Sequence, residues 1–131
     1  MKFLQSITII LLIILIATGV NWLYYYILAK RSAKLLTQEE FREGMRTAQV
    51  IDVRERDTFN AGHIMGARNI PFTVLTQSYA SIRKDKPVYL YDATRALSVR
   101  AANKLRKQGY QDISILKDGY EGWTGKVKKK A

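Results

Sequence analysis

The sequence contains no cysteine and only one histidine, His63. Without a thiol the chain can form no disulfide and no thiolate metal site, and it has no cysteine nucleophile. A single histidine also leaves little for a metal centre or a catalytic triad. The sequence therefore predicts no metal and no cofactor.

Charge is absent from one long segment near the N-terminus. Between Lys2 and Lys30 lies an almost wholly apolar run, Phe3 to Leu28. As a helix this run would be about 39 Å long, which exceeds the roughly 30 Å hydrocarbon core of a bilayer. Aromatic residues typical of a membrane interface gather at its C-terminal end, namely Trp22, Tyr24, Tyr25 and Tyr26. We predict a transmembrane anchor at residues 1–29.

A cleaved signal peptide is the alternative for this segment. The small residues Ala17, Thr18 and Gly19 follow an apolar stretch, as they would before a cleavage site. The segment stays apolar beyond them, and little charge precedes it, so an uncleaved anchor is the favoured interpretation.

Positive charge is distributed unevenly around the apolar run, and the formal net charge of the chain is +11. Lys2 alone precedes the run, whereas five basic residues follow it closely, namely Lys30, Arg31, Lys34, Arg42 and Arg46. The positive-inside rule then predicts a single-pass protein of the cell membrane with a cytoplasmic C-terminal part. The bilayer is its expected partner. The basic residues are dispersed and accompany no nucleic-acid-binding motif, so nucleic acid is not an expected partner.

About 100 residues follow the anchor, enough for one compact domain, which we place at residues 30–125 before a basic tail at 126–131. Strands are predicted at residues 35–36, 49–53, 88–91 and 113–116, and a brief extended piece is predicted at 67–70, closed by Pro71. Helices are predicted at 37–45, 57–61, 72–82 and 98–108, with a helical turn at 119–123. Thr37 and Glu40 have the spacing of a capping box, Ser98 is a candidate N-cap, and Gly109 is a candidate helix stop. Alternating strands and helices predict an α/β fold with a parallel sheet covered on both faces.

The loop between the strand at 88–91 and the following helix is the candidate binding site. α/β proteins bind ligands where such loops lead from a parallel strand into a helix N-terminus. The candidate residues of this loop are Asp92, Ala93, Thr94, Arg95, Ala96, Leu97 and Ser98.

Two stretches resemble the signatures of rhodanese-homology domains. The first is carried by Ile51-Asp52-Val53-Arg54, Phe59, Gly62-His63-Ile64, Gly66-Ala67 and Asn69-Ile70-Pro71, and the second by Leu116-Lys117-Asp118-Gly119-Tyr120-Glu121-Gly122-Trp123. The resemblance implies a small five-stranded parallel sheet with helices on both faces. In active members it implies a sulfurtransferase that carries sulfur as a cysteine persulfide.

The candidate loop departs from the pattern of that family at three positions. Asp92 stands where the family has its cysteine, Arg95 where it has a glycine, and Leu97 where it has an arginine, while Ser98 is kept. Persulfide chemistry needs a thiolate nucleophile, which a carboxylate cannot replace. These residues predict an inactive domain that serves as a binding or regulatory module for an unknown protein partner.

Other interpretations of these residues remain open. Asp92 can accept hydrogen bonds from loop amides at the positive end of the helix, or it can act as a catalytic carboxylate, for example as an acyl-phosphate acceptor. The protein can also be a structural one that basic residues hold at the membrane surface. In the signatures, Asp52 and Arg54 are interpreted as a structural polar pair, His63 as a buried hydrogen-bonding residue, and Trp123 as a packing residue.

Overall fold

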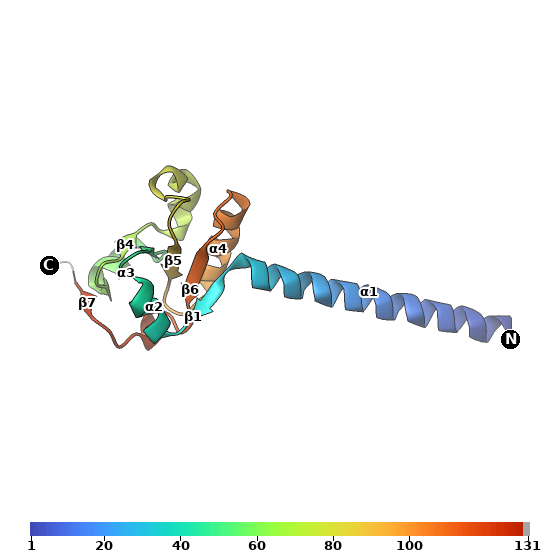
Figure 1. Ribbon diagram of the computed structural model, residues 1–131. Helices are drawn as coiled ribbons and strands as arrows, with labels where there is room; N and C mark the ends of the chain where they lie inside the picture. The colour runs from blue at the N-terminus through green and yellow to red at the C-terminus, as the bar shows by residue number, and fades with distance from the viewer. Residues whose placement is uncertain (130–131) are drawn as a thin grey trace. The chain divides into compact units, whose positions relative to one another are not determined.

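The computed structural model describes residues 1–129, apart from the side chains of residues 28–32, and consists of two compact units (Figure 1). Lys130 and the side chains of Lys30 and Arg31 therefore lie outside the described part. The first unit, Met1–Arg31, is occupied by helix α1 (Lys2–Ser32). Its Lys2–Ile27 portion, with a mean hydropathy of 2.5, is long and apolar enough to cross a membrane, as the sequence predicts. A signal sequence would meet the same criterion of length and apolarity.

The second unit, Ser32–Ala131, is built on a parallel sheet of five strands in the order β1-β6-β5-β2-β4. The strands are β1 (Lys34–Leu36), β2 (Gln49–Asp52), β4 (Arg68–Asn69), β5 (Val88–Tyr91) and β6 (Ile113–Leu116). Ile51, Leu90 and Ile115 lie in register across the three central strands. The predicted fold class and the position of each predicted strand are confirmed.

Alternate side chains of the strands enter two separate cores, because successive residues of a strand point to opposite faces. Ile51, Leu90 and Ile115 belong to one buried cluster, whereas their neighbours Val50, Tyr91 and Leu116 belong to the other. The first cluster is completed by helix α4 (Ala96–Lys107), and the second by Phe41 of helix α2 (Gln38–Gly44). The two helices thus lie on opposite sides of the sheet (Figure 1).

Local signals set most helix ends where they are predicted. Thr37 and Glu40 form the capping box of α2, with the N–H of Glu40 donating to Thr37 Oγ1 and the N–H of Thr37 donating to Glu40 Oε1. Helix α3 (Arg56–Ala61) ends at Gly62, and α4 ends at Gln108 before Gly109, whose φ is +96°. The short helical turn η3 spans Tyr120–Gly122.

Two helical predictions need correction. Residues 72–82 form two 3₁₀ helices, η1 (Phe72–Gln77) and η2 (Tyr79–Ser81), in place of one α-helix. Helix α4 begins two residues before Ser98, which is therefore not its N-cap. For α4, hydrogen bonds from its first turn to the Asp92 carboxylate, described below, take the place of the predicted cap.

A further pair of strands, β3 (His63–Ile64) and β7 (Val127–Lys128), runs antiparallel and was not predicted. β7 lies within residues 126–131, which the sequence suggests to be a basic tail. The N–H of Met65 donates to the carbonyl of Lys126, which extends this pairing by one contact. The start of the predicted tail is thus attached to the first signature of the domain.

Candidate functional site

The candidate loop connects the carboxyl end of β5 to the first turn of α4. Its two ends are buried, since Asp92 is 5% exposed and Ser98 is 0% exposed. Its middle residues, Thr94, Arg95 and Ala96, are exposed to solvent. The loop therefore presents its centre to solvent and hides the two polar side chains that flank it.

The Asp92 carboxylate is held by the start of α4. Its Oδ2 accepts the N–H of Leu97 at 3.2 Å, and its Oδ1 accepts the N–H of Ser98 at 3.4 Å and the Ser98 hydroxyl at 2.6 Å. Arg95 is the N-cap residue by position, but its side chain makes no capping hydrogen bond. Asp92 supplies a negative charge and acceptor oxygens at the positive end of the helix, which is the stabilising arrangement there.

The backbone of the loop is fixed from the other side by the second signature. The N–H of Tyr120 donates to the Asp92 carbonyl at 2.8 Å, and the N–H of Glu121 donates to the Ala93 carbonyl at 3.0 Å. Gly119 has a φ of +66°, and a Cβ at this position would collide with the carbonyl oxygens of Ala93 and Thr94. Glycine is required here because the loop backbone and residue 119 approach each other closely.

Arg95 and Leu97, the two other unusual residues of the loop, point to different environments. Arg95 has a φ of −163°, so the loop does not use the positive φ that a glycine would allow. Leu97 is half-buried and packs against the first core cluster. The side chain at the family's arginine position therefore contributes to the core and leaves no cation there for an anionic substrate.

A buried ion pair lies beneath the first signature. Arg54 Nη2 donates to Asp52 Oδ2 at 2.6 Å and to the carbonyl of Gly62 at 2.7 Å, while Asp52 is fully buried. Burial lowers the pKa of Arg54, but the hydrogen bond and charge of Asp52 outweigh it and raise the pKa above its ordinary value. The pair ties β2 to the end of α3.

Aromatic rings stack around this ion pair. The guanidinium carbon of Arg54 lies 4.3 Å from the ring centroid of Tyr120, which stacks on Tyr91 at 6.3 Å. Burial and the charge of Asp52 raise the pKa of the Tyr91 hydroxyl, which accepts the N–H of Ile64 at 3.0 Å. The second signature is thus packed against the first through Tyr120.

His63 and Trp123 also make structural contacts. Nδ1 of His63 lies 2.8 Å from the carbonyl oxygen of Phe59, whose ring stacks on the imidazole with centroids 3.7 Å apart. Trp123 packs edge-to-face on Phe41 at 6.0 Å within the second core cluster. Neither residue lies in the candidate loop.

Sequence reasoning identifies the loop but misses what holds it. The close approach of Gly119 and the burial of Tyr91 against the ion pair have no signal of their own in the local pattern. Gly119 in the second signature is the nearest sequence clue to this close approach. Within the described part of the chain, no three His, Asp or Glu side chains gather into a possible metal site.

Comparison with known proteins gives a consistent family. The rhodanese-like domain model matches residues 37–126. "Uncharacterized protein YqhL" of Bacillus subtilis is 50% identical over 121 residues, covering 92% of this chain and 96% of that protein. "Thiosulfate sulfurtransferase GlpE" of Shewanella oneidensis is 31% identical over 78 residues, covering 60% of this chain and 77% of that protein.

Solved structures agree with the fold. A rhodanese-like domain protein from Staphylococcus aureus has a TM-score of 0.68 at 22% identity and covers 75% of this chain and 99% of its own. The Alr3790 protein from Anabaena has a TM-score of 0.67 at 29% identity and covers 72% of this chain and 80% of its own. The chain belongs to the rhodanese-like domain family.

Proposed function

We propose that this protein is a single-pass membrane protein whose cytoplasmic rhodanese-like domain has no sulfurtransferase activity and acts as a binding or regulatory module. One observation carries the proposal. The side chain in the position of the family's cysteine is a carboxylate, and it is already hydrogen-bonded to the amides at the start of α4.

The chemistry of this position argues against sulfur transfer. The reaction needs a thiolate that attacks a sulfane sulfur and then carries it as a persulfide. A carboxylate oxygen at Asp92 offers no sulfur nucleophile. It also occupies, from within the protein, donors at the helix start that could otherwise stabilise an anion.

The exposed part of the loop is the candidate contact surface of the module. Thr94, Arg95 and Ala96 are exposed, while the backbone on either side is fixed by Asp92 and by the N–H of Tyr120. A loop whose conformation is already set loses little entropy when a partner binds. Such a loop suits the recognition of a protein partner, with Arg95 as its charged side chain.

An assay for thiocyanate formation from thiosulfate and cyanide tests the inactive state. The full chain, purified in a neutral detergent, should show no rate above the uncatalysed reaction. An active thiosulfate sulfurtransferase in the same detergent is the positive control. Turnover that disappears in Asp92→Ala would contradict the proposal and support a catalytic carboxylate.

Restoring variants separate a missing nucleophile from a changed loop. Asp92→Cys alone should remain inactive, because Leu97 supplies no cation and Arg95 keeps the loop away from a positive φ. The triple variant Asp92→Cys, Arg95→Gly, Leu97→Arg should be the minimum that gives turnover, since preorganised donors can contribute roughly 3 to 4 kcal/mol each to transition-state stabilisation. Equal turnover in the single and triple variants would show that the native loop already has an active shape.

The membrane topology has its own test. The basic residues after the apolar run, such as Lys34, Arg42 and Arg46, support a cytoplasmic domain by the positive-inside rule. Protease added to intact cells should leave the domain uncut and should digest it after lysis. Digestion of the domain in intact cells, or a mature protein that begins near Val20, would contradict the proposed anchor.

A further inference from the structure

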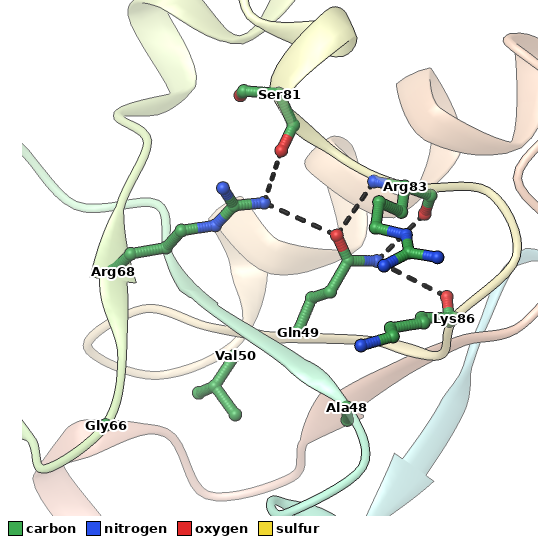
Figure 2. Close-up of a pocket in the computed structure, with 8 residues that line it drawn as sticks. All are labelled: Ala48, Gln49, Val50, Gly66, Arg68, Ser81, Arg83 and Lys86. Atoms are coloured by element: carbon green, nitrogen blue, oxygen red, sulfur yellow. Dashed lines mark hydrogen bonds between the residues drawn. The ribbon is translucent and has the colours of Figure 1, made fainter.

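A second polar site lies at the amino ends of the parallel strands, the end of the sheet opposite the candidate loop. Asp92 follows the carboxyl end of β5, whereas Gln49 and Arg68 are the first residues of β2 and β4. Together with the segment before β5 they line a cavity of about 290 Å³ (Figure 2). This site shares no residue with the loop, so it does not depend on the role proposed for the loop; only the lipid source considered below rests on the proposed membrane anchor.

The Gln49 side chain organises this cavity. Its Nε2 donates to the carbonyl of Arg83 at 2.8 Å, and its Oε1 accepts the N–H of Arg83 at 2.7 Å. On its other side, Oε1 accepts from Arg68 Nη2 at 3.4 Å. Figure 2 shows the Gln49 amide between Arg68 on one side and Arg83 and Lys86 on the other. One neutral side chain thus positions the segments that carry three cations.

The cations of the cavity are only partly neutralised. Arg83 pairs with Asp85, with Nη2 to Oδ2 at 2.5 Å. Arg68 donates to neutral acceptors, including the carbonyl of Ser81 at 2.7 Å. Within the part of the chain that the structure describes, neither Arg68 nor Lys86 has a carboxylate within 4.0 Å. The cavity therefore keeps two unpaired positive charges.

We propose that this cavity binds a phosphate group, carried either by a soluble molecule or by a lipid headgroup. Guanidinium groups match phosphate oxygens in geometry. A phosphate dianion matches two unpaired cations in charge, whereas the single charge of a phosphodiester headgroup neutralises one of them. Arg68, Ser81, Arg83 and Lys86 are all exposed, so the cavity of about 290 Å³ is open to solvent. A phosphate can therefore enter it while the group that carries the phosphate stays outside.

The topology makes a lipid headgroup a realistic source. All five strands of the sheet are parallel, so the amino end of β1 lies at the same end of the sheet as the amino ends of β2 and β4. The chain enters the domain directly after α1 and just before β1. The chain therefore enters the domain at the end of the sheet that carries the cavity. Because the proposed membrane anchor precedes this point, a lipid headgroup is tested as one of the two sources.

The test uses the ¹⁵N-labelled full chain in nanodiscs of phosphatidylcholine. In one arm inorganic phosphate is titrated at constant ionic strength, and in the other the discs contain phosphatidylglycerol in place of part of the phosphatidylcholine. Amides around the cavity, such as those of Ser81 and Lys86, should shift in at least one arm, and those of the Asp92 loop should not. Shifts with free phosphate identify a soluble ligand, and shifts only with phosphatidylglycerol identify the headgroup; each result supports the site.

Matched variants separate a built site from general attraction by positive charge. Arg68→Gln should weaken binding by about tenfold, which corresponds to roughly 1.4 kcal/mol. Lys86→Gln should weaken it by a smaller factor, and because no hydrogen bond of that side chain is lost, folding is not at issue. The control Arg56→Gln with Lys117→Gln removes exposed cations that follow the carboxyl ends of β2 and β6. Equal weakening in the control pair, or no shift in either arm, would overturn the proposal.

Discussion

Replacing Asp92 by alanine distinguishes a structural carboxylate from a catalytic one. The substitution removes the acceptor of two amides at the start of α4 and of the buried Ser98 hydroxyl. A hydrogen bond to a charged group contributes about 1.5 to 3 kcal/mol to stability, and loss of a helix cap costs about 0.5 to 2 kcal/mol. Because these contributions overlap, we expect Asp92→Ala to lower the free energy of unfolding by about 2 to 4 kcal/mol.

Graded variants locate the source of this loss. Asp92→Asn keeps one acceptor oxygen but removes the charge, so its loss should be about half as large. A double-mutant cycle of Asp92→Ala with Ser98→Ala should show a coupling energy of about 1 to 2 kcal/mol, since the two side chains are 2.6 Å apart. Asp112→Ala is the control, because this aspartate is exposed. It should change stability by no more than about 0.5 kcal/mol.

Urea denaturation of the full chain in neutral detergent measures these differences. The chain has two tryptophans, so in a Trp22→Phe background Trp123 fluorescence reports the domain alone. Trp123 packs in the second core cluster and should change its emission on unfolding. Residues kept for catalysis are often neutral or stabilising when replaced. An Asp92→Ala variant as stable as the parent chain, or more stable, would therefore refute the structural role.

Three further predictions use the same chain. Gly119→Ala should lower the free energy of unfolding by more than Gly66→Ala does. Both glycines have a positive φ, but only at Gly119 would the added Cβ collide with carbonyl oxygens of the loop. Equal losses of unfolding free energy in urea denaturation would refute this close approach. Arg54→Met should destabilise the domain by about 3 to 5 kcal/mol, because it leaves Asp52 buried without its partner, and adding Asp52→Asn should recover part of this loss. The hydrogen bond from Arg83 lowers the pKa of the Asp85 carboxyl, so Arg83→Gln should raise that pKa toward its ordinary range in a carboxyl NMR titration. The stabilisation from this ion pair is fully present at a pH above the ordinary pKa of Asp85, and it is lost as the pH falls through the lowered pKa. An unchanged Asp85 pKa would show that the pair does not form.

Local signals explain why the strands and most helix ends could be predicted. Thr37 and Glu40 interact across three residues, and Gly109 supplies a positive φ at a helix end, so both signals lie in a few adjacent positions. The start of α4 differs because its cap is not adjacent. Ser98 has the right residue type for an N-cap, but its hydroxyl donates to Asp92, which lies six positions earlier. The Asp92 carboxylate thus accepts from the first turn of α4, the role that the sequence assigns to Ser98.

Features formed between distant segments could not be predicted from local patterns. β7 consists of two exposed residues, and its pairing with β3 depends on where the chain returns after the second signature. The cavity at the amino ends of the strands joins Gln49, Arg68 and Lys86, which are separated by many residues and share no motif. Their proximity follows only from the order of the parallel strands. The candidate loop could be identified because all of its residues are consecutive.

The way the loop is held explains how the fold can persist without the family's cysteine. Tyr120 and Glu121 bind the loop through backbone carbonyls of Asp92 and Ala93, and Gly119 packs against the same backbone. These contacts do not depend on which side chains the loop carries. A substitution of the nucleophile therefore leaves the second signature in place, and a carboxylate can take over the donors at the start of α4. Both signatures make structural contacts in this chain that need no cysteine, so membership of the family does not by itself establish sulfurtransferase activity.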